Sequence, residues 1–580
     1  MARSFRNRLF HTYSFLITVL FWGIIFFLTF LAAISSCAIT CDVAEHSFFL
    51  SDSIWTNLLT VLLGAVFCLL LRGLARRCGL AARLEEDGYF RLCRRILLTL
   101  LGLLALVWVL ATQFDLVADP LSVQRAAASV LKGKMTPFRT GGYISIYPHQ
   151  MGLVWLSCPL AAVFGSMNSM VFQLLNVLGV VLLYRELSEC CALFGMSRGA
   201  QLGVVLLGIL FYPFWLYCCF VYGNVLGMAF SVLAMRLELR FLRDGGLKRA
   251  FGSAGAACLA VLLKSNYLIF VIGMLVTALV ELLRRFNWQR CVLPMLLIGA
   301  LLFQSKVPVA LAEKVTGYPL DKGMSTWAWI VMGVEESDRG PGWYSAYPWA
   351  SLKEVGFDGT RQEEKAKQIA LTKLKYYAEH KREALDFFTR KTASQWNNPT
   401  FQSYWVAQTR PSRISLPEWV KGFLGRRAEA AASAWLNALQ ILILAGTLLW
   451  CALCRREQRQ VSLCFAVTFI GGFVFHLFWE AKCQYTLSYF VLLLPLASGG
   501  WAELARLLAG LLSRKGQKTD QRSLLKRSLR QIAPFAAMSL VLCGLIWVLY
   551  ANGNNYSLRC DDAAYAAYLT EPEAVDYLEK

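Results

Sequence analysis

Charged residues are scarce in this sequence. Asp, Glu, Lys and Arg make up 16% of its 580 residues, whereas hydrophobic residues make up 57%. Ordinary soluble domains carry about 25% charged residues, so this composition excludes that class. Apolar runs long enough to cross the hydrocarbon core of a bilayer recur along the whole chain. The sequence therefore predicts an all-α polytopic membrane protein with about 13 transmembrane helices, since helices satisfy their own backbone within lipid.

Acidic residues are fewer than basic ones, and the formal net charge is +21. The basic residues lie in short clusters between apolar runs, which is typical of cytoplasmic loops and not of a nucleic-acid-binding surface. We therefore predict a multi-pass protein of the cell membrane with a cytoplasmic N-terminus. The clusters expected inside lie at residues 72–95, 240–249, 284–290 and 514–530.

Histidine is also rare, with 5 residues, and none is spaced as a metal-binding partner of His149. The residues alone therefore predict no metal ligands. Most of the 18 cysteines lie inside apolar runs, where a thiol acts as a small hydrophobic side chain. Cys37 and Cys41 are the one pair considered for an exposed disulfide. No clear small-residue cleavage site follows the first apolar run, which predicts a membrane anchor.

Alternation of apolar and polar stretches predicts five parts. Met151–Gly165 is interpreted as lying at the outer surface or re-entering there, because this keeps every basic cluster on one side. An amphipathic helical stretch is expected over Gln362–Arg390. The parts are an N-terminal helix pair with a basic loop (1–94), a membrane module whose first outer loop spans 113–165 (95–305), an extracytoplasmic region (306–430), C-terminal transmembrane helices (431–550) and an acidic outer tail (551–580).

Several charged residues are expected at the outer membrane face beside apolar runs, which predicts a mixed acid–base site. A carboxylate in such a site can take the proton of an incoming hydroxyl, and lysines can hold a phosphate. A sugar donor with a lipid tail and a phosphodiester would need such a site. We assign Asp119 as the base, with Asp115 as second candidate. We assign Lys264, Lys482 and Lys306 to binding the phosphate of the donor. The residues expected to bind substrate are Tyr143, Tyr147, His149, Gln150, Glu335, Trp343, Glu480 and Tyr485.

Each assignment has a structural alternative. Asp119 precedes Pro120 and fits a helix N-cap, and Asp115 fits a solvated supporting residue. Lys264 fits a side chain that reaches the headgroups from the end of a span. Glu480 and Lys482 fit an exposed ion pair, and His149 a hydrogen-bonded loop residue. The aromatic residues fit an interfacial belt as well as a sugar-stacking surface.

Three motifs resemble those of the GT-C glycosyltransferases, which include the protein O-mannosyltransferases and the lipid A aminoarabinose transferases. The nearest resemblance is to bacterial, Firmicutes-type members. It covers roughly residues 97–500, preceded by two extra spans. Many members carry an Asp-Glu pair where this chain has Asp119-Pro120. The motifs are Asp119…Gly142-Tyr143…Tyr147-Pro148-His149-Gln150-Met151-Gly152, Leu262-Leu263-Lys264-Ser265-Asn266 and Glu480-Ala481-Lys482-Cys483-Gln484-Tyr485.

The resemblance implies a GT-C-type bundle, an acidic base in the first outer loop and a polyprenyl-phosphate sugar donor. It also implies transfer to an acceptor hydroxyl of a glycan, lipid or protein on the extracytoplasmic face, with inversion at the anomeric carbon. It leaves open a second carboxylate or a divalent cation, Mg²⁺ or Mn²⁺. The alternatives are a lipid-linked glycan flippase and a non-catalytic assembly subunit of the cell envelope. A flippase would place ionisable groups near mid-span.

Overall fold

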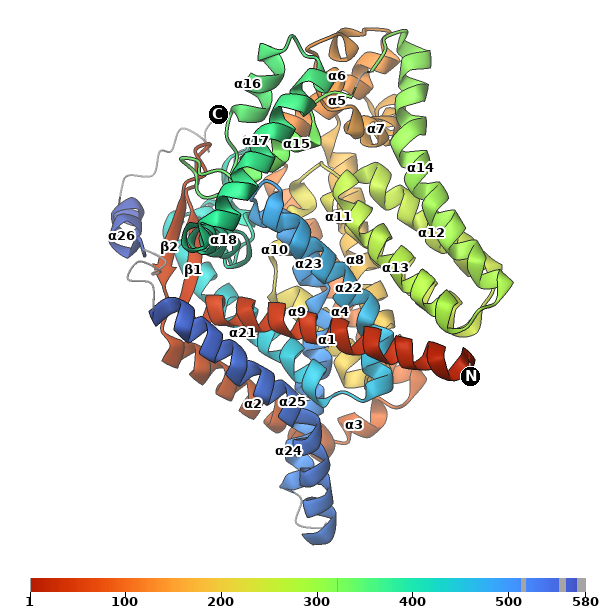
Figure 1. Ribbon diagram of the computed structural model, residues 1–580, viewed down its shortest axis with the longest axis vertical. Coiled ribbons are helices and arrows are strands. Elements are labelled where there is room, and N and C mark those ends of the chain that lie inside the picture. The colour runs from red at the N-terminus through yellow and green to blue at the C-terminus, as the bar shows by residue number, and fades with distance from the viewer. Residues whose placement is uncertain (1, 321, 513–517, 552–559, 571–580) are drawn as a thin grey trace.

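The computed structural model describes residues 2–320, 322–512, 518–551 and 560–570, and these residues are mostly helical (Figure 1). Among them, nine helices are long and apolar enough to cross a membrane, or up to eleven spans when two bent helix pairs are included. The prediction of an all-α polytopic membrane protein is therefore confirmed. The prediction of about 13 spans is not.

The nine long helices are α1 (Ala2–Ile34), α2 (Ile54–Arg77), α4 (Asp87–Thr112), α8 (Ser169–Leu193), α13 (Leu268–Arg284), α14 (Trp288–Thr316), α21 (Arg426–Leu453), α22 (Arg456–Phe478) and α25 (Lys518–Ala551). The bent pairs join α9 (Arg198–Leu210) to α10 (Pro213–Leu216) with η3 (Tyr217–Cys219), and α23 (Cys483–Val491) to α24 (Leu493–Leu511).

Shorter elements complete the fold. They are α3 (Leu80–Arg83), α5 (Ala118–Leu131), η1 (Thr136–Phe138), α6 (Tyr143–Ile146), η2 (Pro148–Gln150), α7 (Met151–Phe164), α11 (Asn224–Asp244), α12 (Leu247–Leu263), η4 (Ser265–Tyr267), α15 (Thr326–Gly333), α16 (Tyr347–Glu354), α17 (Gly359–Glu379), α18 (Lys381–Trp396), α19 (Ser403–Gln408), α20 (Glu418–Leu424) and α26 (Asp562–Thr570).

Two of the spans expected from the sequence lie in α11 and α12. Helix α12 has 17 residues, which at 1.5 Å per residue is shorter than the hydrocarbon core of about 30 Å. Helix α11 carries Arg236, Glu238 and Arg240 along its second half. Helix α7 has 14 residues and contains Pro159, so it too is shorter than a span, as expected for this segment.

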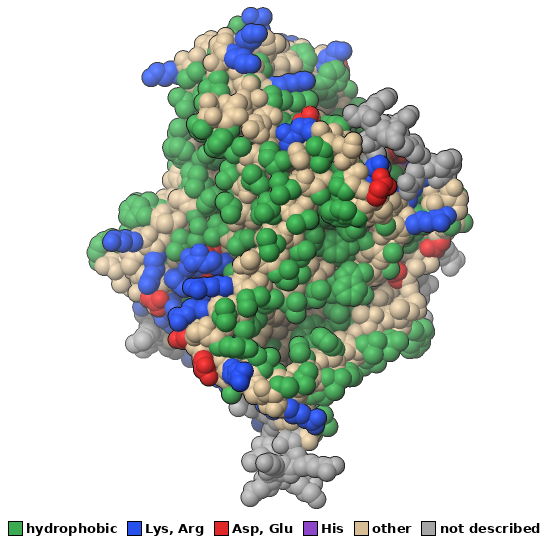
Figure 2. All heavy atoms as spheres, turned by 180° about the vertical axis from the view of Figure 1, so that it is seen from behind, with side chains coloured by type: hydrophobic (Ala, Val, Ile, Leu, Met, Phe, Trp, Pro, Cys, Tyr) green, Lys and Arg blue, Asp and Glu red, His purple; other side chains and the backbone are tan. Residues whose placement is uncertain are grey.

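Apolar side chains cover a broad part of the molecular surface (Figure 2). Helix α2 illustrates this, because Trp55, Phe67 and Leu70 are 80%, 63% and 65% exposed. Side chains of this kind are stable when they face lipid tails and unfavourable when they face water. The surface of α2 is therefore suited to the bilayer.

The polar region between α14 and α21 differs from expectation at its amphipathic segment. One helical stretch was expected over Gln362–Arg390, but the chain forms α17 and α18, which meet at His380. Asp358 caps α17 by accepting hydrogen bonds from the backbone N–H groups of Thr360 and Arg361. Tyr377 of α17 packs against Phe387 and Phe388 of α18, and the second half of α18 is buried.

A small hairpin joins α1 to α2 and was not predicted. Strands β1 (Ser35–Ile39) and β2 (Ser47–Ser51) pair antiparallel, with Ser35 opposite Ser51 and Ile39 opposite Ser47. Helix α26 packs on β2, beside the hairpin in Figure 1. Cys37 and Cys41 are separate thiols, and Cys41 Sγ accepts a hydrogen bond from the Tyr568 hydroxyl at 2.8 Å. Residues 552–559 and 571–580 of the expected acidic tail lie outside the described residues, and so do residues 514–517 of the expected basic cluster.

Helices α21 and α24 pack backbone to backbone through two glycines. A Cβ atom added to Gly500 would overlap the carbonyl oxygen of Gly446, and one added to Gly446 would meet the Trp501 ring. Gly255 in α12 offers a contrast, since a Cβ there meets nothing within 4 Å. Close approach of α21 and α24 therefore requires hydrogen at position 500.

We expect Gly500→Ala to lower the thermal unfolding midpoint of the detergent-solubilised protein by about 1–3 °C, because the unfolding entropy of a chain of 580 residues is large. Overpacking against a rigid backbone costs about 1–3 kcal/mol. Gly255→Ala is the control and should leave the midpoint equal or raise it, because alanine has the higher helix propensity by about 1 kcal/mol. A Gly500→Ala midpoint equal to that of the unmodified protein would contradict the close crossing.

Candidate functional site

Asp119 lies in the first turn of α5, in the segment expected to form the outer loop. The residue at the N-cap is Val117, so the Asp119 side chain does not cap this helix. Its Oδ2 atom instead accepts a hydrogen bond from the Tyr222 hydroxyl at 3.1 Å. The carboxylate is exposed. Ala118 directly before it has a φ of 50°, a left-handed conformation that costs a non-glycine residue about 1 kcal/mol. Such strain clusters at functional sites.

Tyr222 connects the candidate base to the candidate phosphate-binding lysine. Lys264 Nζ lies 5.0 Å from the centroid of the Tyr222 ring, the distance of a cation–π contact. Gln150 adds a third group, because its Nε2 atom donates to the Tyr222 hydroxyl at 2.6 Å. Three segments far apart in sequence therefore meet at one tyrosine.

Two glycines allow these segments to approach the end of α12. Gly223 has a φ of 74°, and a Cβ atom there would overlap the carbonyl group of Leu263. A Cβ on Gly152 would overlap the backbone of Leu262. Any larger residue at either position would push Tyr222 or Gln150 away from Lys264.

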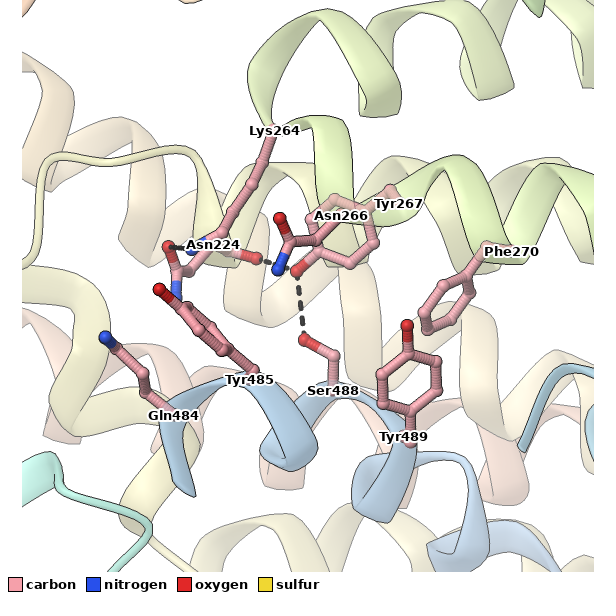
Figure 3. A pocket seen from close by; sticks show the side chains of 9 residues that line it. All are labelled: Asn224, Lys264, Asn266, Tyr267, Phe270, Gln484, Tyr485, Ser488 and Tyr489. Carbon is pink, nitrogen blue, oxygen red and sulfur yellow. Dashed lines mark hydrogen bonds between the residues drawn. The ribbon is translucent and has the colours of Figure 1, made fainter. Parts of the chain in front are cut away.

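Lys264 ends α12 in an extended conformation, with a φ of −157°, and its side chain points at a neutral partner. Lys264 Nζ donates to Asn224 Oδ1 at 2.7 Å and lies 5.5 Å from the centroid of the Tyr485 ring. A small pocket adjoins these residues (Figure 3) and is lined by Asn224, Lys264, Asn266, Tyr267, Phe270, Gln484, Tyr485, Ser488 and Tyr489. Its lining changes from amide and amine groups to aromatic rings.

Glu480 and Tyr485 form the fourth side of the site. The Tyr485 hydroxyl donates to Glu480 Oε2 at 3.1 Å, and the Glu480 side chain is 3% exposed. Burial raises the pKa of Glu480 to about 7, although the nearby Lys482 ammonium opposes the rise. Burial likewise lowers the pKa of Lys264 to about 7, against the opposing fields of Asp119 and Glu480. Glu480 and Lys264 therefore each gain or lose a proton near neutral pH.

The loop between α5 and α7 contributes an aromatic wall. The rings of Tyr143 and Tyr147 lie 5.0 Å apart, and that of His149 is 6.1 Å from Tyr147. Burial raises the pKa of Tyr143 and Tyr147, and the charge of Asp119 adds to the rise. His149 itself is exposed. These residues thus lie within the field of the Asp119 carboxylate.

Lys482 forms an ion pair with Glu45, a residue that the sequence analysis did not single out. Its Nζ atom lies 3.2 Å from Glu45 Oε1. Burial lowers the pKa of Lys482, but the negative charges of Glu45 and Glu480 raise it by more, so the pKa is raised overall. Glu45 Oε2 also pairs with Arg339. The expected assignment of Lys482 to a donor phosphate therefore competes with an ion pair already formed inside the protein.

The remaining expected residues are engaged in other contacts. Asp115 Oδ1 accepts from the backbone N–H of Leu116 at 2.8 Å, and its own N–H donates to the Pro411 carbonyl. Trp343 is fully buried, so neither ring face is open to a sugar in this conformation, and its Nε1 atom donates to Ser394. The neighbouring Gly342 carbonyl accepts from the Ala481 N–H, which anchors the segment carrying Glu480.

Glu335 and Lys306 also lie elsewhere. Burial raises the pKa of Glu335, and the residue that opposes this rise is Lys373 of α17. Lys306 is exposed and lies within α14, although the sequence placed it at the start of the extracytoplasmic region. The structure therefore gathers Asp119, Lys264, Glu480 and Tyr485, with Gln150, His149 and the tyrosine pair. Trp343 lies beside the Glu480 segment, where its backbone pairs with Ala481, but its ring is buried.

Tyr222 and Asn224 were missed by sequence reasoning. A signal for them exists, because Tyr222-Gly223-Asn224 is a polar interruption between two apolar stretches. Comparison with protein-family models gives no match, and neither does comparison with curated proteins. Over the described ranges, no three His, Cys, Asp or Glu side chains gather as a metal site.

We expect Lys264 to titrate near pH 7, since burial disfavours its ammonium form. Reductive methylation with ¹³C-formaldehyde and NMR detection would give its pKa in the solubilised protein. The resonance should be missing from Lys264→Arg, which assigns it. A Lys264 signal that titrates near pH 10, as an ordinary lysine does, would contradict the desolvated site.

Proposed function

We propose that this protein is an integral membrane glycosyltransferase of the GT-C type that takes sugar from a polyprenyl-phosphate donor. The observation that carries the proposal is the Tyr222 bridge, which brings an exposed carboxylate and a partly buried lysine to one site. A sugar hydroxyl needs its proton removed during attack, and a leaving phosphate needs a cation. Asp119 and Lys264 supply these two groups.

In the proposed reaction an acceptor hydroxyl oxygen attacks the anomeric carbon while the bond from that carbon to the phosphate oxygen breaks. The hydroxyl proton passes to Asp119, which is exposed to the arriving acceptor. The leaving lipid phosphate keeps the bonding electron pair and is stabilised by Lys264. One displacement of this kind inverts the anomeric carbon. Tyr143 and Tyr147 would line the sugar.

A lipid-linked glycan flippase remains the second candidate, because charged groups also lie inside the helix bundle. Glu186 is 1% exposed and pairs with Arg236, and Glu189 pairs with Arg94 and Arg240. Both carboxylate oxygens of the fully buried Glu238 are without a hydrogen-bond partner among the described residues. Buried ionisable groups of this kind are typical of transport pathways. This charged cluster lies on α4, α8 and α11.

We expect Asp119→Asn to fold normally and to transfer sugar at least about a hundredfold more slowly, because removing a general base costs about 10²–10⁴-fold in rate. The asparagine amide oxygen still accepts the Tyr222 hydrogen bond, so the site geometry is kept. The measurement follows consumption of lipid-linked sugar by mass spectrometry, in membranes that contain each variant.

Asp115→Asn is the matched control for this experiment. Its carboxylate accepts a hydrogen bond from the adjacent Leu116 N–H, whereas the Tyr222 hydroxyl bonds Asp119, so transfer should fall much less. Normal transfer by Asp119→Asn with loss in Asp115→Asn would move the base to Asp115. Normal transfer by both variants would end the proposal of a carboxylate base in this loop.

The proposed orientation places the site outside the cell, which labelling can test. Lys132 at the end of α5 and Lys248 at the start of α12 are both exposed. In a background without native cysteines, Lys132→Cys should react in intact cells with a membrane-impermeant maleimide, and Lys248→Cys should react only after the cells are opened. The reverse pattern would place the site in the cytoplasm.

A further inference from the structure

The hairpin between α1 and α2 extends a buried carboxylate into the candidate site. Its turn is fixed by Asp42, whose Oδ1 atom accepts from Thr40 Oγ1 at 2.7 Å and from the Ala44 N–H at 2.9 Å. The Asp42 carbonyl accepts from Trp405 Nε1, and Ser47 N–H donates to the Arg339 carbonyl. Glu45 is therefore held by contacts on both sides of its position.

Glu45 occupies a backbone conformation that suits another residue type. Its φ is 51°, in the left-handed region where glycine and asparagine are favoured. Its side chain is 2% exposed and meets three partners, Lys482, Arg339 and Gln402. A strained residue with a buried charge is costly on both counts. The turn alone gives no reason for glutamate, whereas the two cations do.

Lys264 differs from Lys482 and Arg339 in the kind of partner that it contacts. Lys482 and Arg339 share the Glu45 carboxylate, and Lys482 also lies within the field of Glu480. Lys264 donates to the uncharged amide of Asn224 and lines the pocket of Figure 3. An anion entering this site therefore meets one cation whose charge is not already balanced by a carboxylate in contact with it.

We propose that Glu45 is a specificity-determining residue, which occupies Lys482 and Arg339 so that the site accepts a singly charged lipid phosphodiester in preference to a lipid diphosphate. The inference rests on the proposed function, because it concerns the donor of that reaction. A phosphodiester needs one cation, whereas a diphosphate needs several to replace its hydration. Removing the Glu45 charge would release two further cations beside Lys264.

The test compares two short lipid probes on the full chain in detergent at pH 6, where Lys264 is protonated. Farnesyl methyl phosphate is a diester with one negative charge, and farnesyl diphosphate carries more than one. Affinities follow from tryptophan fluorescence titration. We expect the unmodified protein to prefer the diester, and Glu45→Gln to shift the ratio of affinities toward the diphosphate by at least about tenfold, the usual effect of one charge-assisted contact.

Two variants separate this role from simple structural support. Glu45→Asp keeps the charge and suits the left-handed backbone, so it should retain the preference for the diester. The double variant Glu45→Gln with Lys482→Met removes the released lysine together with its partner and should return the ratio toward that of the unmodified protein. Of the two cations that lose Glu45, the double variant removes the more buried one, Lys482, while Arg339 keeps its contact with the Tyr344 ring. It therefore gives an answer where Glu45→Gln alone does not fold.

The possible results distinguish this inference from the proposed function. A ratio unchanged in Glu45→Gln would overturn the role of Glu45, and so would a preference of the unmodified protein for the diphosphate. Loss of diester affinity by tenfold or more in the double variant would overturn it too, because Lys482 would then hold the phosphate itself. Failure of the unmodified protein to bind either probe would instead contradict the proposed phosphate site.

Discussion

The cost of burying charge inside the protein governs this structure. An ionised side chain removed from water costs several kcal/mol unless hydrogen bonds or opposite charges replace its hydration. The protein meets this cost differently at each lysine. Lys391 is 1% exposed and donates to the backbone carbonyls of Gly333, Leu477 and Trp479, which fixes α18 against α15 and α22. Lys482 pairs with Glu45, and Lys264 meets an amide and two aromatic rings. Lys264 is therefore the one of these three whose environment favours an incoming anion.

The two halves of the candidate site are held in place by different contacts. The segment carrying Glu480 is held from one side by the Gly342 carbonyl and from the other by the ion pair of Lys482. The segment carrying Tyr222 is held by close backbone contact between Gly223 and Leu263. Asp119 and Lys264 thus take their relative positions from Tyr222, while Glu480 takes its position from the polar region and the hairpin.

Sequence reasoning identified the membrane class and the segments of the site, because apolar run length and the placement of basic clusters depend on local composition. Asp119, Lys264 and Glu480 each lie beside an apolar run, and their common side of the bilayer was predicted from loop charge. The break at His380 was missed because no glycine or proline marks it. Glu45 was missed because it lies in the turn of a short hairpin. Its partners, Arg339, Gln402 and Lys482, are far away in the sequence, so no local sequence pattern indicates them. Trp343 was expected to face a sugar, since an aromatic residue in a polar segment gives no sign of whether it packs inside.

The central claim is that this protein consumes a lipid-linked sugar, and the most direct measurement is mass spectrometry of lipid extracts. Cells that make the protein are compared with cells that lack it and with cells that make Asp119→Asn. We expect a polyprenyl-phosphate sugar to accumulate in the cells without the protein and in those with Asp119→Asn, since neither transfers the sugar onward. Identical lipid profiles in all three strains would contradict the account.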